Sequence, residues 1–264
     1  MKHYIKSIAL IILVAGLFTA CKKEELNAEK AMQIVVNGYN GSSNALQLSI
    51  DTTVYDVNTN YGSYIMRADA VISQNVVYTY RSEKKRMLTL TDTVTKQIVF
   101  SRELPADSPK GLFNYIFLNG KELEINAPAA DPTTNKLGFY VHYPTSNEPF
   151  DIFLYRVDNT TGTEYRTYIA QNVKPGTWTY VNYDVPANFN NSRIIGNSGA
   201  TVCFTKAGST NLWAFDNDQS KSSILASSLL LPVENEKGLV QPYFYTPSLV
   251  SQGLSRLFFY PERQ

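Results

Sequence analysis

Residues 33–40, QIVVNGYN, and residues 46–51, LQLSID, are echoed later in the chain by residues 137–144, LGFYVHYP, and residues 150–155, FDIFLY. Each time, a segment rich in β-branched and aromatic residues is followed by a small polar stretch and then by a second such segment. Apolar and polar side chains alternate along these segments, which is typical of strands with one buried and one solvated face. This approximate repeat predicts two β-units with the same order of strands.

The composition of the chain also favours an all-β fold. It contains 18 tyrosines and 13 phenylalanines, and no long window of the sequence repeats apolar residues at the helical spacing. Residues 87–104 are expected to form a hairpin with a polar tip at residues 93–96. The positive-φ positions that tight turns need are supplied by Asn37-Gly38, Asn40-Gly41, Asn119-Gly120 and the stretch from Asn159 to Gly162. We therefore predict β-sandwich domains, immunoglobulin-like or transthyretin-like.

Residues 127–135, APAADPTTN, are the predicted boundary between two domains. Two prolines prevent this stretch from continuing a strand, and it carries few side chains to bury. The chain is then divided into a signal peptide (1–20), a tether (21–31), a first β-sandwich (32–126), a linker (127–135) and a second β-sandwich (136–264).

The N-terminal segment resembles a bacterial lipoprotein signal. Lys2 and Lys6 give it a positive start, and residues 8–18 form an apolar run too short to span a bilayer. The small residues Thr19-Ala20 then precede Cys21, whose thiol is the expected lipidation site. Several acyl chains, palmitate among them, would anchor the mature chain stably in membrane lipid.

Charged residues directly after this cysteine indicate where the protein is displayed. Lys22, Lys23, Glu24 and Glu25 resemble the short export tag of Bacteroidetes lipoproteins that reach the outer face of the outer membrane. A solvated tether is the alternative. Loss of the signal peptide removes two lysines and changes the net charge from +1 to −1. Nucleic-acid binding is therefore not expected.

Residues suited to catalysis are few. His142 is the one histidine outside the signal peptide, and no Gly-x-Ser-x-Gly or nucleotide-binding motif accompanies it. Cys203 stands between Val202 and Phe204 in a predicted strand, so we expect a buried structural thiol. We expect no catalytic residue, no cofactor and no metal site, and therefore a protein that is not an enzyme.

Acidic residues leave one enzymatic alternative open. The two carboxylates of a glycosidase do not need to be close in sequence, so a glycoside-active enzyme is kept as a less favoured hypothesis. Asp216-Asn217-Asp218 has oxygen ligands at alternate positions but lacks the spacing of an EF-hand loop. An Asx-rich turn is expected there.

Aromatic side chains offer the best candidates for ligand binding. Trp178 and Tyr180 lie in a predicted strand over residues 177–185, and Trp213 lies further along the chain. Exposed rings of this kind stack on sugar faces, which makes the three residues a candidate glycan-binding set. The alternative is that both tryptophans are core residues of the second sandwich.

Two continuous apolar runs lie near the C-terminus, YFY at residues 243–245 and LFFY at residues 257–260. We expect both runs to be closing strands. Such runs also suit an edge that pairs with another protein.

Two tripeptides, Asp51-Thr52-Thr53 and Asp92-Thr93-Val94, resemble the acceptor motif for O-glycosylation of exported Bacteroidetes proteins. Thr52 and Thr93 are therefore candidate glycosylation sites. Both fall near predicted strand ends or turns, where a glycan is readily accommodated.

The repeat and the lipoprotein signal together make the chain similar to Bacteroidetes surface lipoproteins with tandem immunoglobulin-like or transthyretin-like domains of unknown function. The resemblance implies a non-catalytic binding or structural module on the outer membrane, facing the cell exterior. The alternatives are a glycan-binding accessory protein of polysaccharide uptake, and an adhesin or surface-assembly subunit whose partner is another envelope protein. An exposed tryptophan would favour the first, an exposed apolar edge strand the second, and two carboxylates across a cleft an enzyme.

Overall fold

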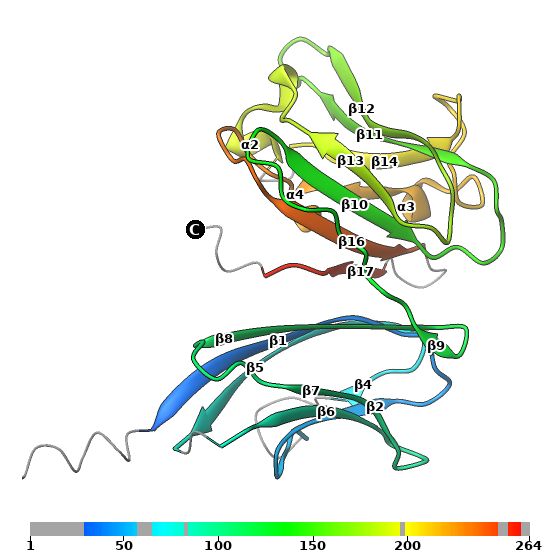
Figure 1. Ribbon diagram of the computed structural model, residues 1–264. Coiled ribbons are helices and arrows are strands. Elements are labelled where there is room, and N and C mark those ends of the chain that lie inside the picture. The colour runs from blue at the N-terminus through cyan, green and yellow to red at the C-terminus, as the bar shows by residue number, and fades with distance from the viewer. Residues whose placement is uncertain (1–28, 57–64, 82–83, 196–198, 248–252, 260–264) are drawn as a thin grey trace, which may run out of the picture.

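Figure 1 shows the computed structural model of the chain, a set of packed β-sheets with a few short helices. It describes residues 29–56, 65–81, 84–195, 199–247 and 253–259. Cys21 and the tag Lys22–Glu25 lie outside the described residues, so lipidation and export stay predictions. Within the described ranges, no helix has the length and apolarity needed to cross a membrane. The predicted all-β class is confirmed.

The first sandwich is made of two facing sheets with the orders β5-β1-β8-β9 and β3-β2-β6-β7, and β4 pairs with β2 (Figure 1). Its strands are β1 Lys30–Asn40, β2 Leu46–Ile50, β3 Thr53–Val54, β4 Ile65–Met66, β5 Ala70–Tyr80, β6 Met87–Asp92, β7 Ile98–Glu103, β8 Lys110–Leu118 and β9 Lys121–Glu122. Strands β6 and β7 form the hairpin predicted over residues 87–104. Apolar side chains from both sheets, such as Ile34 and Leu90, form one core cluster.

The second sandwich has sheets with the orders β13-β10-β16-β17 and β12-β11-β14-β15. Its strands are β10 Asn135–Val141, β11 Phe150–Val157, β12 Glu164–Val173, β13 Thr179–Tyr183, β14 Thr201–Lys206, β15 Ser223–Leu225, β16 Val240–Thr246 and β17 Gly253–Arg256. Its short helices are η3 Ala187–Phe189, α2 Ser192–Ile195, α3 Gln219–Ser222 and α4 Ala226–Leu229. Phe139, Ile152 and Phe204 belong to a second core cluster between these sheets.

The repeated sequence segments occupy equivalent strands. β1 and β10 each have an antiparallel neighbour on one side and a parallel neighbour on the other. β2 and β11 lie in the sheets that face them. The connection at residues 127–135 is irregular apart from one bridge between Asp131 and Thr134 and the first residue of β10. That it separates two domains able to fold alone stays a prediction.

A third apolar cluster joins the two sandwiches. Tyr243 and Tyr245 point into the second core, whereas Phe244 between them belongs to the third cluster. The Phe244 ring stacks on Tyr39 of the first sandwich, with ring centroids 4.9 Å apart. Because both faces of β16 are covered, its residues 243–245 form a continuous aromatic run without alternation.

Strand β17 pairs with β16 at the edge of its sheet and lies between the sandwiches, facing the sheet that contains β1 (Figure 1). Asn37 Nδ2 donates to the carbonyl oxygen of Arg256 at 2.6 Å, and the Gly38 amide donates to Ser255 Oγ at 2.8 Å. We call the region made by β17 and the third apolar cluster the seam. Its combination of apolar packing and hydrogen bonds fixes β1 against the second sandwich.

The prediction of a strand over residues 257–260 is wrong. β17 ends at Arg256, and the described residues after it, 257–259, belong to no strand. The Leu257 amide still donates to the carbonyl oxygen of Pro242 at 2.9 Å. Pro242 has no N–H to return that bond, so the pairing between β16 and β17 stops there.

Candidate functional site

A cavity of about 370 Å³ opens at the seam. Tyr39 and Asp69 line it from the first sandwich, and His142, Asp216 and Lys221 line it from the second. Its other lining residues are Ala70, Val71, Tyr143, Pro144, Thr145, Thr246, Pro247 and Gly253. Small-molecule sites typically measure about 300–1,000 Å³, so this seam cavity is large enough to hold a ligand.

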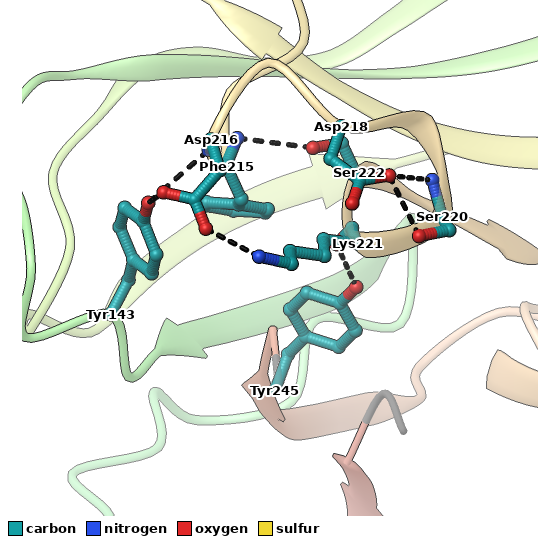
Figure 2. Close-up of polar contacts among 8 residues, drawn as sticks. All are labelled: Tyr143, Phe215, Asp216, Asp218, Ser220, Lys221, Ser222 and Tyr245. Atoms are coloured by element: carbon teal, nitrogen blue, oxygen red, sulfur yellow. Dashed lines mark hydrogen bonds and ion pairs between the residues drawn. The ribbon is translucent and has the colours of Figure 1, made fainter. Parts of the chain in front are cut away.

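An ion pair and a phenol meet at one wall of the seam cavity (Figure 2). Lys221 Nζ lies 2.5 Å from Asp216 Oδ2, and Tyr143 OH donates to Asp216 Oδ1 at 2.6 Å. The side chain of Lys221 is only 10% exposed, whereas that of Asp216 is 50% exposed. The hydrogen bond between them lowers the pKa of Asp216 and raises the pKa of Lys221. Both groups therefore stay charged at neutral pH.

The loop before α3 places this ion pair. Asp216 and Asn217 have φ angles of 52° and 53°, a left-handed conformation that Asp and Asn tolerate better than most residues. Asn217 Oδ1 accepts from the Trp213 amide at 3.0 Å, and Asp218 Oδ1 accepts from the Ser220 amide at 2.8 Å. The segment is the predicted Asx-rich turn, and the side-chain oxygens of Asn217 and Asp218 bond within the loop.

Two further contacts fasten the loop to the second core. Tyr245 OH, from β16, donates to the carbonyl oxygen of Lys221 at 2.6 Å (Figure 2). The amide of Phe215 donates to Ser222 Oγ at 3.0 Å, and the Phe215 ring is fully buried. Because the loop is held at both ends, the charged atoms of the ion pair have a fixed position at the cavity wall.

Tyr39 and His142 bring aromatic surface to the seam cavity. The His142 ring centroid lies 5.6 Å from that of Tyr39 and 6.2 Å from that of Phe244. Burial lowers the pKa of His142, so its imidazole is neutral at pH 7. Tyr39 OH donates to Asp69 Oδ1, and burial together with that bond raises the pKa of Tyr39. Both rings are therefore uncharged.

The seam cavity combines two carboxylates, one ammonium group and the uncharged rings of Tyr39 and His142. This set can accept hydrogen bonds from hydroxyl groups and donate hydrogen bonds to them, next to an apolar surface. The cavity is poorly suited to general acid catalysis, because a general acid needs a pKa near the working pH. The pKa of Asp216 is instead lowered, which moves it further from neutral pH.

Trp178 and Tyr180 lie at the seam but do not line its cavity. Trp178 Nε1 donates to the carbonyl oxygen of Glu124 at 3.0 Å, and its ring stacks on Tyr180 with centroids 5.7 Å apart. The half-buried Trp178 packs against the third apolar cluster. It is neither a residue of the second core nor an open stacking platform.

Trp213 lies away from Trp178, in a recess of about 250 Å³ that Phe153, Arg166 and Cys203 also line. The structure therefore does not unite the predicted tryptophan set. Cys203 is buried as predicted, and burial raises the pKa of its thiol to about 12. Such a thiol is unreactive at neutral pH.

The two candidate glycosylation sites differ in accessibility. Thr52 is exposed in the turn between β2 and β3. Thr93 is half-buried, and its hydroxyl donates to the carbonyl oxygen of Ala45 at 3.0 Å. Glycosylation of either residue stays a prediction. A glycan on Thr93 would break its hydroxyl bond to Ala45, whereas Thr52 is exposed in its turn.

In the sequence, His142 is notable as the one histidine outside the signal peptide and Asp216 as part of an Asx-rich segment, and neither feature indicates the seam cavity. Tyr39 and Asp69 are thirty positions apart in the chain and carry no motif. Lys221 follows Asp216 by five residues, and this short spacing of opposite charges around a turn is the one signal that the sequence offered.

The sheets and the seam define the class of protein to which this chain belongs. It is an all-β protein of packed sandwiches with a ligand-sized cavity at their junction. No protein-family model matches the chain, and no curated protein matches it by sequence. Among solved structures, a candidate cell adhesion protein from Bacteroides uniformis is similar over 85% of this chain and 96% of its own, with 11% identity and a TM-score of 0.27.

The tip fimbrial protein Mfa3 from Porphyromonas gingivalis, with a C-terminal truncation, is similar over 87% of this chain and 100% of its own. Its identity is 13% and its TM-score 0.22. A likeness at these TM-scores carries no argument about the fold or the function of this chain.

Proposed function

We propose that the chain is a non-catalytic binding module on the bacterial cell surface, held at the outer membrane through Cys21, whose seam cavity binds a neutral saccharide. The observation that carries the proposal is the ion pair of Asp216 and Lys221 at the cavity wall. A carboxylate beside an ammonium group offers an acceptor and a donor to neighbouring hydroxyl groups of one sugar ring. The rings of Tyr39 and His142 offer aromatic surface to its apolar face.

Two carboxylates line the seam cavity, which is the feature expected of a glycoside-active enzyme. A glycosidase needs one of its two carboxyl groups protonated so that it can act as the general acid. Lys221 holds Asp216 in the charged form, and Asp69 accepts a hydrogen bond from Tyr39. Both carboxylates are thus engaged as hydrogen-bond acceptors, which supports binding rather than hydrolysis.

Titration calorimetry of the full chain with neutral oligosaccharides tests the proposal. We expect saturable binding, weakened at least tenfold by Asp216→Asn because the carboxylate acceptor and its charge are lost. The matched control is Asp218→Asn, two residues away, which makes the same change of a carboxylate to an amide, keeps an oxygen to cap α3 and does not line the cavity. Equal loss in the two variants, or no binding of any neutral oligosaccharide, would rule out the seam cavity as the site.

Anchoring is tested separately by labelled fatty acid in growing cells. Lipidation needs the sulfur of Cys21, so Cys21→Ser should carry no label and should keep its signal peptide. Undiminished label in this variant would remove the basis for the anchor.

An adhesin or surface-assembly subunit is the second candidate function, and exposed edge strands favour it. β7 is the last strand of its sheet, and its residues Ile98 and Val99 are 63% and 38% exposed. Unpaired edges with apolar side chains can pair with another chain.

Sedimentation of the full chain should show concentration-dependent assembly that Ile98→Lys abolishes and Val157→Lys, on the inner strand β11, does not. A monomer at all concentrations would contradict self-assembly.

A further inference from the structure

A recess on the outer face of β11 and β14 is separate from the seam cavity. Phe153 alternates along β11 with Ile152 and Leu154, which belong to the second core, so its ring points away from that core. The residue as a whole is nevertheless only 2% exposed. Other side chains on the same face cover it and leave a recess of about 250 Å³. The core between the two sheets does not need this outer face to be covered.

Arg166 supplies the charge of this recess. Its guanidinium carbon lies 4.4 Å from the ring centroid of Phe153, and Nη1 donates to the carbonyl oxygen of Thr210 at 3.1 Å. A guanidinium that stacks by its face keeps the other N–H groups of its edge for a ligand, and that edge matches a carboxylate with two parallel hydrogen bonds. Among the residues that line the recess, all of them described, Arg166 alone carries a full charge.

Neutral groups and one large ring complete the recess. Tyr155, Thr201 and Gln219 bring a phenol, a hydroxyl and an amide, and half-buried Trp213 adds its indole. Burial and the carboxylate of Glu164, which accepts a hydrogen bond from the phenol, raise the pKa of Tyr155, so the phenol stays uncharged and keeps its oxygen as an acceptor. Hydroxyl-bonding groups around an aromatic ring favour a sugar over a peptide terminus.

We propose that the recess binds one carboxylated sugar residue, with its carboxylate on Arg166 and its apolar face on Trp213. The recess is smaller than the range of about 300–1,000 Å³ of most ligand sites, so it suits a single ring, such as the end of an acidic oligosaccharide. This site rests on its own residues and stands whether or not the seam cavity binds a neutral saccharide.

Nitrogen-15 labelling of tryptophan in the full chain gives a direct measurement, because the chain contains two tryptophans. The probes are an oligosaccharide of hexuronate units and the same oligosaccharide as its neutral methyl ester. We expect the acid to shift the indole resonance of Trp213 and to leave that of Trp178 in place, and we expect the ester to bind at least tenfold more weakly. Trp213→Phe assigns the two resonances.

Arg166→Lys should weaken binding of the acid at least tenfold, because an ammonium group cannot make the paired hydrogen bonds. Arg156→Lys is the matched control, since Arg156 also stacks on a ring of the same sheet, that of Tyr165, but does not line the recess. The unshifted Trp178 resonance reports that each variant is folded. Equal affinity for acid and ester, an unmoved Trp213 resonance, or tighter binding of a peptide with a free C-terminal carboxylate would each overturn the proposal.

Discussion

At the scale of single residues, the ion pair of Lys221 and Asp216 is the contact on which the proposed site depends. Lys221 is nearly buried, whereas Asp216 keeps half of its surface in solvent. A charge in that position needs a partner, because an unpaired buried charge is costly. Asp216 therefore both completes the fold of the loop before α3 and offers its open side to the seam cavity.

The ion pair predicts how stability depends on pH. The pKa of Asp216 is lower in the folded than in the unfolded chain, so its contribution is present above the ordinary range of about pH 4 and is lost as the pH falls through the lowered value. The melting temperature of wild type should therefore exceed that of Asp216→Asn at pH 7, and the difference should shrink on acidification toward pH 3. A difference that grows in acid would contradict the pairing.

Trp178 and Trp213 are expected to respond differently to the same substitution. Trp178→Phe removes the indole N–H that bonds to Glu124 at the seam, which should lower the free energy of unfolding by about 1 kcal/mol. Within the described part of the chain, no protein acceptor binds the indole N–H of Trp213, so Trp213→Phe should stay within about 0.5 kcal/mol of wild type. Urea denaturation measures both, and the reverse order would contradict the placement of Trp178.

At the scale of elements, the parallel pair of β1 and β8 depends on a glycine. Gly38 has a φ angle of +145°, and a Cβ at this position would lie 1.8 Å from the carbonyl oxygen of Tyr115 on β8. No other side chain fits there without displacing a strand. The same residue bonds to Ser255 of β17, so Gly38 lies where β1 contacts both β8 and β17.

Gly38→Ala should therefore separate β1 from β8 and abolish a single cooperative melt. Gly120→Ala is the control, because Gly120 also has a positive φ, +81°, but its Cβ would meet nothing within 4 Å. That variant should lose only about 1–2 kcal/mol of backbone conformational energy. Calorimetric melts of the two variants measure the difference, and equal melting temperatures would disprove the close contact of β1 and β8.

Much of this element structure could be predicted from the sequence, because alternation is a local signal. Leu46, Leu48 and Ile50 alternate with polar residues and are buried in turn along β2. Phe244 broke the alternation because the seam covers the outer face of β16, and no local pattern says what will cover a strand. The seam cavity was missed for the same reason, since its two walls come from different sandwiches.

At the scale of the whole molecule, the seam bears on the predicted division into domains. Each sandwich has its own core cluster, which an independent domain needs. Tyr39, Ile116 and Leu118 of the first sandwich, however, belong to the third cluster, which they form together with residues of the second sandwich such as Phe244. Separation of the two sandwiches would expose these side chains to water.

Fragments 32–126 and 136–264 should each show β-type circular dichroism and a cooperative melt, at a lower temperature than the intact chain because the seam is lost. Mixing them should raise both melting temperatures if the seam reforms. Two fragments without cooperative melts would indicate instead that the sandwiches fold as a single unit.

The proposed function requires the seam cavity to bind a saccharide without cleaving it. A crystal structure of the full chain, grown with a neutral oligosaccharide, tests this most directly. We predict sugar hydroxyl groups within hydrogen-bond distance of Asp216 and Lys221, a ring face against Tyr39, and intact glycosidic bonds. An oligosaccharide bound only outside the seam cavity, or cleaved within it, would rule out the proposed function.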